Sequence, residues 1–311
     1  MTVVGRFAPT PSGDLHFGSL VAALGSWLQV RAAGGRWLVR IDDVDTPRVV
    51  PGAADRILQT LEAFGLTWEG EVWCQSQRGD RYAAALDQLH AQGRLYGCDC
   101  SRSRLAALHL PRSEEGAWIY PGLCRERALD REGRAQRLCV ADLPPVTVPD
   151  RVQGDYRQDL AVDVGDFVLR RADGVYAYHL ATVLDDADQG VTHVVRGADL
   201  LPSTPRQVAL QQLLGLPTPV YAHLPVATVA GQKLSKQTLA QPLQPAQAPQ
   251  QIRAALTFLD LHPPADLDSQ GELLAWAIAH FDLTRLPRVC SRALSVGAAS
   301  IVSQPAAQPL T

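Results

Sequence analysis

The amino-acid sequence predicts an α/β protein: a doubly wound parallel sheet of the Rossmann type, interrupted by an insertion and followed by a short C-terminal helical domain. Strand-like and helix-like patterns alternate over residues 1–97 and again over 166–228, which predicts the two halves of the sheet. Between them, residues 98–165 form the expected insertion, most of it irregular and rich in arginine, proline and cysteine. A chain of 311 residues is long enough for this organisation.

The first half of the sheet begins with a short apolar run at residues 3–8, which predicts a buried strand. Turn-forming residues follow at 10–14, and apolar residues then recur at helical spacing between 19 and 33. The next expected elements are a strand at 36–42 and helices at 53–64 and 81–92. This order of strand, loop, helix, strand and helix is how a doubly wound sheet begins.

The second half follows the insertion. We expect a hairpin with an Asp-Gly turn at 167–179, a strand at 191–197, a helix at 205–214 and a strand at 223–228. The C-terminal part, residues 229–294, shows amphipathic helical patterns near 249–261, 270–281 and 284–294. Residues 295–311 are small and proline-rich, so a flexible tail is expected.

Composition and charge exclude several classes of protein. Apolar residues make up 46% and charged residues 20%, as in soluble globular proteins, and no apolar run is long enough to span a bilayer. The N-terminus lacks the pattern of a signal peptide, and six cysteines are too few for a disulfide framework, so we expect a reducing cytoplasm. The net charge of −3 neither indicates nor excludes a nucleic-acid partner.

Lysine occurs at only two positions, Lys233 and Lys236, within the segment G231-Q-K-L-S-K-Q237. All other Lys/Arg positions are arginine. A lysine is a compact charge on a flexible stem and is suited to a single phosphate oxygen, whereas arginine is a wide planar fork. Chance could place two lysines this close together, but the flanking Gly231 and Ser235 indicate a loop, and the hypothesis is that it closes over a phosphate.

A second candidate phosphate site is the segment T10-P-S-G-D-L-H-F-G-S19, which joins the first strand to the first helix. Free backbone N–H groups at a helix N-terminus bind anions, Gly18 lets a ligand approach the backbone, and His16 can donate to a phosphate. The glycine spacing matches neither the P-loop nor the dinucleotide-binding pattern.

Considered together, these two segments resemble the paired signature of class I aminoacyl-tRNA synthetases: His-x-Gly after the first strand and Lys-Leu-Ser-Lys after the last. The resemblance implies ATP as a substrate, with Mg²⁺ beside it. It also implies catalytic roles for His16, Gly18, Lys233 and Lys236, and ATP contacts from His16, Gly18, Ser19 and Lys236. Such a site would work by positioning and charge, with no covalent enzyme intermediate.

Four motifs, in order, resemble the glutamyl/glutaminyl branch of that family. They are R6-F-A-P-T-P-S-G-D-L-H-F-G-S19, R40-I-D-D-V-D-T-P-R48, Y178-H-L-A-T-V-L-D-D186 and V195-R-G-A-D-L200. The resemblance implies a glutamate pocket made by Arg6, Phe7, Ala8, Pro9, Thr10, Asp42, Tyr178 and Arg196.

Within this expected pocket, Arg196 would read the γ-carboxylate, because a guanidinium can bind a carboxylate through two hydrogen bonds. Tyr178 would hydrogen-bond the same substrate. Asp42 stands where the branch usually has glutamate, and would hold the α-ammonium. Its shorter side chain leaves two alternatives open: a contact through water, or a shift of the contact to Asp43.

Three cysteines in the insertion, Cys98, Cys100 and Cys124, have a spacing typical of a structural zinc site with one further ligand. His109 is the generic fourth ligand. Short relatives in the branch carry a tyrosine instead, and Tyr120 matches it, so the resemblance implies one Zn²⁺ per chain held by Cys98, Cys100, Tyr120 and Cys124. Free thiols are the alternative. The remaining cysteines have no partner at ligand spacing: Cys74, Cys139 and Cys290. The arginines of 101–139 are expected by default to form a solvated basic face, and contact with an RNA backbone is the second interpretation.

Only 74 residues follow Gln237, which leaves room for a helical stub but not for an anticodon-binding domain. In this the chain resembles the short paralogues of the branch, the glutamyl-queuosine tRNA(Asp) synthetase family. That resemblance implies tRNA-independent activation of L-glutamate with ATP, then transfer to the queuosine base at the wobble position of tRNA(Asp). It also implies a cytoplasmic monomer with no membrane contact. The alternatives are a truncated glutamyl-tRNA synthetase that charges a 3′ end, and a non-catalytic RNA-binding relative.

Overall fold

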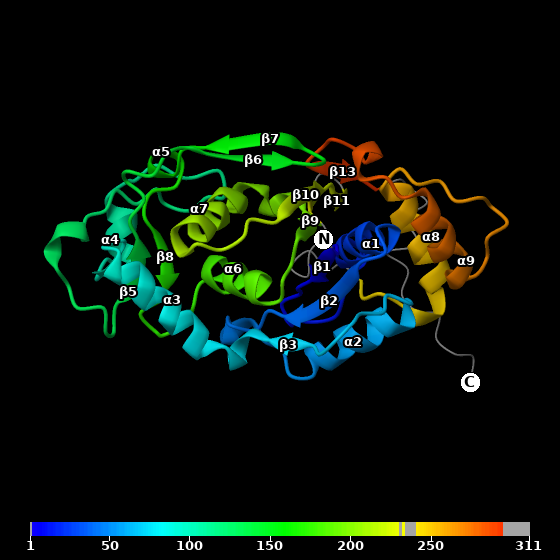
Figure 1. Cartoon of the computed structure of the whole chain (residues 1–311), viewed down its shortest axis with the longest axis horizontal. Helices are drawn as coiled ribbons and strands as arrows, with labels where there is room; N and C mark the ends of the chain where they lie inside the picture. The colour runs from blue at the N-terminus through cyan, green and yellow to red at the C-terminus, as the bar shows by residue number, and fades with distance from the viewer. Residues whose placement is uncertain (1, 230–231, 234–240, 295–311) are drawn as a thin grey trace.

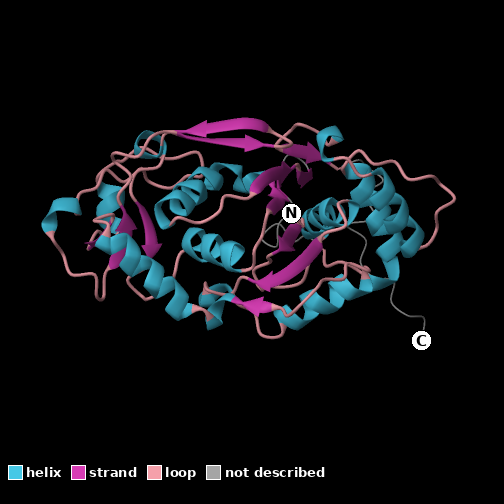
Figure 2. Cartoon of the chain, viewed as in Figure 1, coloured by secondary structure: helices cyan, strands magenta, loops and turns pink. Residues whose placement is uncertain are grey.

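The computed structural model describes residues 2–229, 232–233 and 241–294. The molecule is elongated, with a parallel sheet in the middle, the two C-terminal helices α8 (Ala248–Phe258) and α9 (Gln270–His280) at one end, and the insertion at the other (Figures 1 and 2). Among the described residues, no helix combines the length and the apolar character needed to cross a bilayer.

The central sheet is parallel, as the sequence predicts. Strand β2 (Arg36–Ile41) lies between β1 (Val4–Phe7) and β3 (Trp73–Cys74), and β9 (His193–Gly197) pairs with β10 (Val220–Leu224). The two groups meet at β1 and β9, because the Thr192 backbone N–H donates to the Val4 carbonyl at 2.9 Å. The spatial order is therefore β3-β2-β1-β9-β10, and the chain reverses direction across the sheet at β1.

Helices cover both faces of this sheet. They are α1 (Phe17–Ala32), α2 (Ala53–Ala63), α3 (Gly79–Ala91), α6 (Tyr178–Asp188) and α7 (Thr204–Leu214). The apolar core divides into two large clusters, one around α1, α2, α8 and α9 and one around α3, α6 and α7. Consecutive residues of β9 contribute to different clusters, Val195 to the first and Val194 to the second. Since neighbouring side chains of a strand point to opposite faces, the sheet is wound on both sides.

The insertion contains more regular structure than the sequence predicts. Strand β5 (Ala135–Leu138) lies between β4 (Leu95–Cys98) and β8 (Phe167–Arg170), which flank the insertion, in an antiparallel sheet. The hairpin of β6 (Val146–Asp150) and β7 (Gly154–Gln158) packs against β10 and α7. The short helices here are α4 (Arg102–Ala107) and α5 (Leu160–Asp163). Buried and exposed side chains alternate along β6, the period of a strand with one face in the core. The expectation that most of the insertion is irregular is wrong on this point.

The hairpin expected at 167–179 is half correct. The Asp-Gly turn forms, since the Arg171 N–H donates to the Val175 carbonyl at 2.8 Å, and Arg170 pairs with Tyr176. The second strand ends there, because Tyr178 begins helix α6, whose Leu180 and other apolar side chains are fully buried. Packing of this helix outweighs the strand-like composition of residues 175–179.

The C-terminal part differs from expectation in two places. Pro225 divides the strand expected at 223–228 between β10 and β11 (Val226–Val229), which belong to different sheets. Helices α8 and α9 confirm two of the three expected helices. The third, at 284–294, is wrong: a single 3-10 turn is followed by β13 (Ser291–Ala293), which pairs with β11. Pro287 has no N–H to donate within a helix. The expected tail, 295–311, lies outside the described residues.

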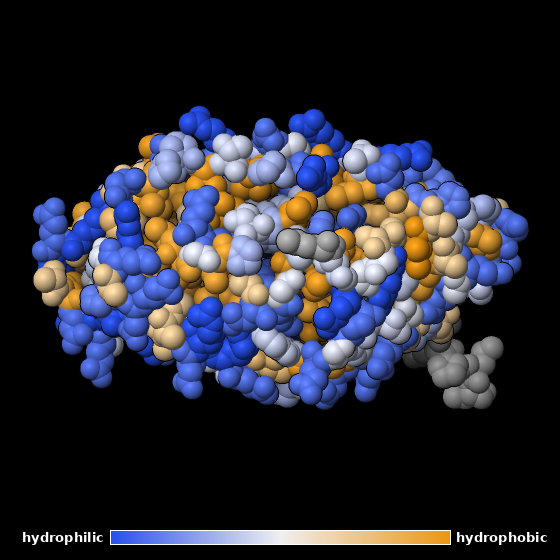
Figure 3. All heavy atoms as spheres, viewed as in Figure 1, coloured by the Kyte–Doolittle hydropathy of each residue, from blue (hydrophilic) through white to orange (hydrophobic). Residues whose placement is uncertain are grey.

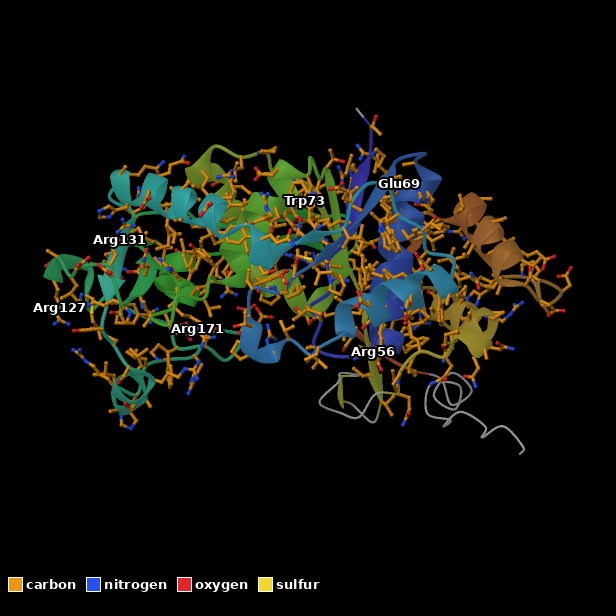
Figure 4. All side chains as sticks on the ribbon, turned by 90° about the horizontal axis from the view of Figure 1, so that it is seen from below. Arg56, Glu69, Trp73, Arg127, Arg131 and Arg171 are labelled. Atoms are coloured by element: carbon orange, nitrogen blue, oxygen red, sulfur yellow. The ribbon has the colours of Figure 1, made fainter. Side chains whose placement is uncertain are left out.

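Short 3-10 turns complete the described elements: Thr46–Arg48, Gln75–Gln77, Arg125–Arg127, Ala198–Ser203, Pro245–Gln247 and Leu283–Arg285. On the surface, hydrophilic side chains dominate the outline of the molecule, and hydrophobic ones show between the β6–β7 hairpin and the helices α6 and α7 (Figure 3). The insertion end carries several arginines, among them Arg127 and Arg131 (Figure 4).

Candidate functional site

A cavity of about 520 Å³ lies at the centre of the sheet. It opens where β1, β9 and β10 end, which is where ligands bind in open parallel sheets. The residues that line it include Arg6, Phe7, Ala8, Pro9, Thr10, His16, Gly18, Ser19, Tyr178, Arg196, Asp199 and Val226. Segments that lie up to about 220 residues apart in the sequence therefore surround one space.

The expected phosphate turn lies at one wall of this cavity, where His16 caps the N-terminus of α1. The Ser19 backbone N–H donates to His16 Nδ1 at 3.3 Å. Because Nδ1 accepts this bond, a neutral His16 carries its proton on Nε2 and can donate it to a ligand. The first turn of α1 contains no acidic residue, so the positive end of the helix dipole is not offset there.

The lysine segment is only partly described. Lys233 belongs to the two-residue strand β12 (Gln232–Lys233), which pairs with β11, while Lys236 lies outside the described residues. Both flanks of the segment are nevertheless placed. Val226 at the start of β11 lines the cavity, and after the segment Pro242 pairs with His16. The Leu243 N–H also donates to the Leu15 carbonyl at 2.8 Å. The residues before the lysine segment therefore line the cavity, and the residues after it lie beside the histidine turn.

Arg196 is a buried cation at the cavity, with 5% of its surface exposed. Its Nη1 donates to the Tyr178 hydroxyl at 3.1 Å, and its Nη2 donates to Thr204 Oγ1 at 2.8 Å. Its Nε donates to His223 Nε2 at 3.0 Å. Burial lowers the pKa of His223 to about 4, so this histidine is neutral at pH 7. These partners are all uncharged and leave the charge of Arg196 available to an anionic ligand.

Arg6, the second arginine of the cavity, is held differently. Its Nε donates to both carboxylate oxygens of Asp186, at 3.1 and 3.2 Å. Asp186 also accepts from Arg40 Nη1 at 2.7 Å. Burial by itself would raise the pKa of Asp186, but the two arginines outweigh it and hold the pKa below its ordinary value. Arg6 is therefore part of a buried ion-pair network, and its partners Asp186 and Arg40 are not among the residues that line the cavity.

The two acids expected near the α-ammonium group are not among the residues that line the cavity. Asp42 Oδ1 accepts from Arg40 Nε at 2.7 Å, and burial raises the pKa of Asp42 to about 6 in spite of this ion pair. Asp43 accepts from the backbone and the hydroxyl of Ser76, each at 2.7 Å. Both carboxylates have protein partners in this structure, and a contact with the α-ammonium group stays a prediction.

The three cysteines expected to bind a metal do converge. The Sγ atoms of Cys98, Cys100 and Cys124 lie within 4.8 Å of one another, in a group that does not include His109. The hydroxyl of Tyr120 lies 3.4 Å from the Sγ atoms of Cys98 and Cys100, and its side chain is almost fully buried. Three thiols and a phenol oxygen therefore surround one point, a donor set that could hold a metal ion.

Sequence reasoning missed the residues behind Arg196, namely Thr204, His223 and the carboxylate of Asp150 that His223 contacts at 2.6 Å. None belongs to a motif that carried the resemblance, and Asp150 lies 73 residues before His223. The only local signal is a histidine in an apolar strand, which indicates a buried polar contact without naming its partner.

Comparison with known proteins agrees with this geometry. The family model described as tRNA synthetases class I (E and Q), catalytic domain, matches residues 2–252. A Glutamyl-Q tRNA(Asp) synthetase of Synechococcus sp. is 57% identical over 288 residues, which is 91% of this chain and 96% of the relative. A protein of the same name from Chromobacterium violaceum is 56% identical over 91% of this chain and 95% of its own length.

Among solved structures, the glutamate-tRNA synthetase of Elizabethkingia anophelis superposes with a TM-score of 0.79 at 25% identity, over 96% of this chain and 69% of that one. The chain belongs to the class I tRNA synthetases of the E and Q family, and within it to the group of proteins named Glutamyl-Q tRNA(Asp) synthetase.

Proposed function

We propose that this protein activates L-glutamate with ATP, without tRNA, and then transfers the glutamyl group to the queuosine base at the wobble position of tRNA(Asp). The observation that carries the proposal is the cavity itself: a buried arginine with uncharged partners faces the same space as the N-terminus of α1. The first feature fits a carboxylate side chain and the second fits a phosphate. The names of the relatives that are 57% and 56% identical support the choice of substrates.

Glutamate would bind between the two arginines of the cavity. Arg196 would face the γ-carboxylate together with the Tyr178 hydroxyl, and Arg6, held by Asp186, would line the same pocket. Phe7, Ala8, Pro9 and Thr10 leave β1 along the same wall and would bound the pocket. The α-ammonium group would contact Asp42 directly, through water, or through Asp43.

ATP would lie with its phosphates against the histidine turn. His16 Nε2–H, Gly18 and Ser19 at the start of α1 would face the triphosphate, and Lys236 with Lys233 would cover it from the other side. Mg²⁺ bound to the triphosphate would offset part of its charge. An oxygen of the glutamate α-carboxylate attacks the α-phosphorus, the bond to the β-phosphate oxygen breaks, and pyrophosphate leaves. The protein contributes positioning and positive charge.

The second step is an acyl transfer. A hydroxyl of the queuosine cyclopentenediol attacks the carbonyl carbon of glutamyl-adenylate, the hydroxyl proton is lost, and AMP leaves with the electrons of the broken bond. Because the acceptor is a tRNA, the reaction belongs in the cytoplasm. Neither step requires a second subunit, so we propose that the protein acts as a monomer.

The cysteine cluster would hold one structural Zn²⁺, with Cys98, Cys100 and Cys124 as thiolates and Tyr120 as the fourth ligand. Bound zinc would tie β4 to the loop that contains Tyr120 and Cys124, and so would stiffen the insertion. The arginines at this end of the molecule, such as Arg127 and Arg131, would then contact the RNA backbone (Figure 4).

A second candidate function is aminoacylation of a tRNA 3′ end, which the structural likeness to a glutamate-tRNA synthetase favours. One experiment separates the two. Radiolabelled glutamate and ATP are incubated with the protein and with tRNA(Asp) that either carries or lacks queuosine, and the product is cut with nucleases to locate the label. The proposal predicts label in the anticodon loop of the queuosine-containing tRNA alone. Label at the 3′-terminal adenosine of both tRNAs would contradict it.

A further inference from the structure

A buried pair of side chains, Asp150 and His223, stands directly behind Arg196. Asp150 Oδ2 lies 2.6 Å from His223 Nδ1, and both side chains are completely buried. On the other side of the imidazole, His223 Nε2 lies 3.0 Å from Arg196 Nε. The three side chains form a line that runs from the end of β6, through β10, to the guanidinium at the cavity.

The donor and acceptor roles in this line follow from the arginine, because its Nε always carries a hydrogen and can only donate. His223 Nε2 must therefore accept, so the proton of the neutral ring is on Nδ1 and is donated to Asp150. A carboxylate only accepts, and Asp150 thereby fixes this tautomer. The low pKa of His223, about 4 and caused chiefly by burial, agrees with a neutral ring at physiological pH.

Asp150 is itself held in place by the turn of the β6–β7 hairpin. Its Oδ1 accepts from the backbone N–H groups of Val152 at 3.0 Å and Gln153 at 2.8 Å, and from that of His223 at 3.2 Å. This leaves Oδ2 for the imidazole. The hairpin also docks on β10, since the Gln153 side chain donates to the His223 carbonyl at 2.8 Å. The position of the carboxylate is thus set by backbone contacts.

The two arginines of the cavity differ in what holds their Nε. For Arg6 the partner is the carboxylate of Asp186, which compensates its charge directly. For Arg196 the partner is the neutral imidazole of His223, which separates the guanidinium from the carboxylate of Asp150. A carboxylate in direct contact would occupy Arg196 as an ion pair and would repel an anionic ligand. The imidazole fixes the guanidinium without neutralising it.

We propose that Asp150 and His223 are positioning residues that hold Arg196 through an uncharged imidazole, so that its guanidinium can bind the side-chain carboxylate of the substrate, and that they thereby set the preference for glutamate over glutamine. This inference rests on the proposed function, in which the cavity takes glutamate. It assigns to the β6–β7 hairpin, part of the insertion, a role in amino-acid selection.

The first test is Asp150→Asn. Asparagine has the same shape and keeps an oxygen for the backbone N–H groups of the turn, but it presents an NH₂ group to His223 Nδ1. The ring must then carry its proton on Nε2, where it opposes the N–H of Arg196. We expect the KM for glutamate to rise at least about tenfold, the loss of one hydrogen bond to a charged group, while the KM for ATP changes less than about twofold. Discrimination against glutamine should fall by a similar factor.

The readouts are glutamate- and glutamine-dependent ATP–pyrophosphate exchange, calorimetric binding of L-glutamate, and ¹⁵N NMR of the histidine rings. NMR should show His223 as the Nδ1–H tautomer in the wild type and as the Nε2–H tautomer in Asp150→Asn. A purely structural role would not produce this change together with a selective effect on glutamate.

Two further variants keep the test valid if Asp150→Asn folds poorly. His223→Gln offers an oxygen to Arg196 and an NH₂ group to Asp150, so it should retain most of the selectivity, whereas His223→Leu should lose it. His193→Gln, at the start of β9 and outside the cavity lining, is the matched control.

Normal glutamate KM and selectivity in both Asp150→Asn and His223→Leu would overturn the inference, as would a parallel rise of the KM values for glutamate and ATP. A wild-type protein that neither activates nor binds glutamate would instead overturn the proposed function.

Discussion

Replacing Arg40 with methionine should destabilise the folded protein by about 3–5 kcal/mol at neutral pH, because it removes the cation from a buried network of acids. Arg40 is completely buried, and its side chain lies 2.7 Å from the carboxylates of Asp42 and Asp186 and 3.8 Å from that of Asp185. Methionine keeps much of the apolar volume of the arginine stem, so the loss reports mainly on charge.

The size of the destabilisation follows from the ion pairs that the buried acids keep when Arg40 is replaced. Asp186 keeps Arg6 as a partner, but Asp42 loses its 2.7 Å ion pair while it stays almost fully buried. An uncompensated buried charge of this kind typically costs several kcal/mol. The loss is large against the total stability of roughly 5–15 kcal/mol for a folded domain.

The same network predicts how the loss depends on pH. Burial raises the pKa of folded Asp42 from 3.8 to about 6, so the folded state binds this proton more tightly than the unfolded state does. The resulting stabilisation is fully present below pH 3.8 and is lost as the pH rises through about 6. Without Arg40 the pKa of Asp42 should rise further. Asp42 is then neutral at pH 5 and its burial costs less, so the destabilisation should be smaller at pH 5 than at pH 7.5.

Urea unfolding at both pH values, analysed by linear extrapolation, measures the effect. Arg36→Met is the matched control, because Arg36 lies at the exposed end of the same strand and should change stability by less than about 0.5 kcal/mol. A destabilisation of Arg40→Met below about 1 kcal/mol at pH 7.5, or one equal at the two pH values, would refute the reasoning on buried charge.

Three further predictions concern the cavity, the cysteine cluster and the core. Tyr178→Phe removes the hydroxyl 3.1 Å from Arg196 Nη1, so steady-state kinetics should show a glutamate KM about three- to tenfold higher and an unchanged ATP KM; an unaffected glutamate KM would exclude the contact. Elemental analysis should find about one zinc per chain, with lower zinc content and melting temperature in Cys124→Ser, and a zinc-free wild type of full stability would exclude the metal site. Gly25→Ala places a Cβ 2.4 Å from a leucine of β10 and should destabilise by about 1–3 kcal/mol in urea, unlike Gly79→Ala, which has open space; equal effects would contradict the close packing of α1.

Much of the fold could be predicted from the sequence because its signals are local. The helical spacing of apolar residues at 19–33 predicts α1, and the run at 36–42 predicts β2, each correct to within about two residues at its ends. The errors arise where tertiary pairing decides. Residues 284–294 have a helical composition, but β13 forms there because β11 offers it an edge. The strands of the β6–β7 hairpin are short and β6 contains Pro149, so the alternation of buried and exposed residues is hard to recognise in the sequence.

The residues of the candidate site also fall into two groups, those that local sequence motifs identify and those that only the tertiary structure brings together. Arg6, His16, Tyr178 and Arg196 belong to motifs, and the sequence names them without showing that they line one cavity. The Asp150–His223 pair belongs to no motif. Its members meet only because the hairpin of the insertion docks on β10, a contact between segments 73 residues apart that no local pattern encodes.

The central claim is that the histidine turn and the lysine segment act on one triphosphate beside the glutamate pocket. Glutamate-dependent ATP–pyrophosphate exchange in the complete absence of RNA, measured for the wild type and for Lys236→Ala, tests it most directly. We expect exchange in the wild type and a loss of at least about a hundredfold in the variant, because a charged contact to the reacting phosphates is removed. Exchange that requires tRNA, or that continues nearly unchanged without Lys236, would contradict it.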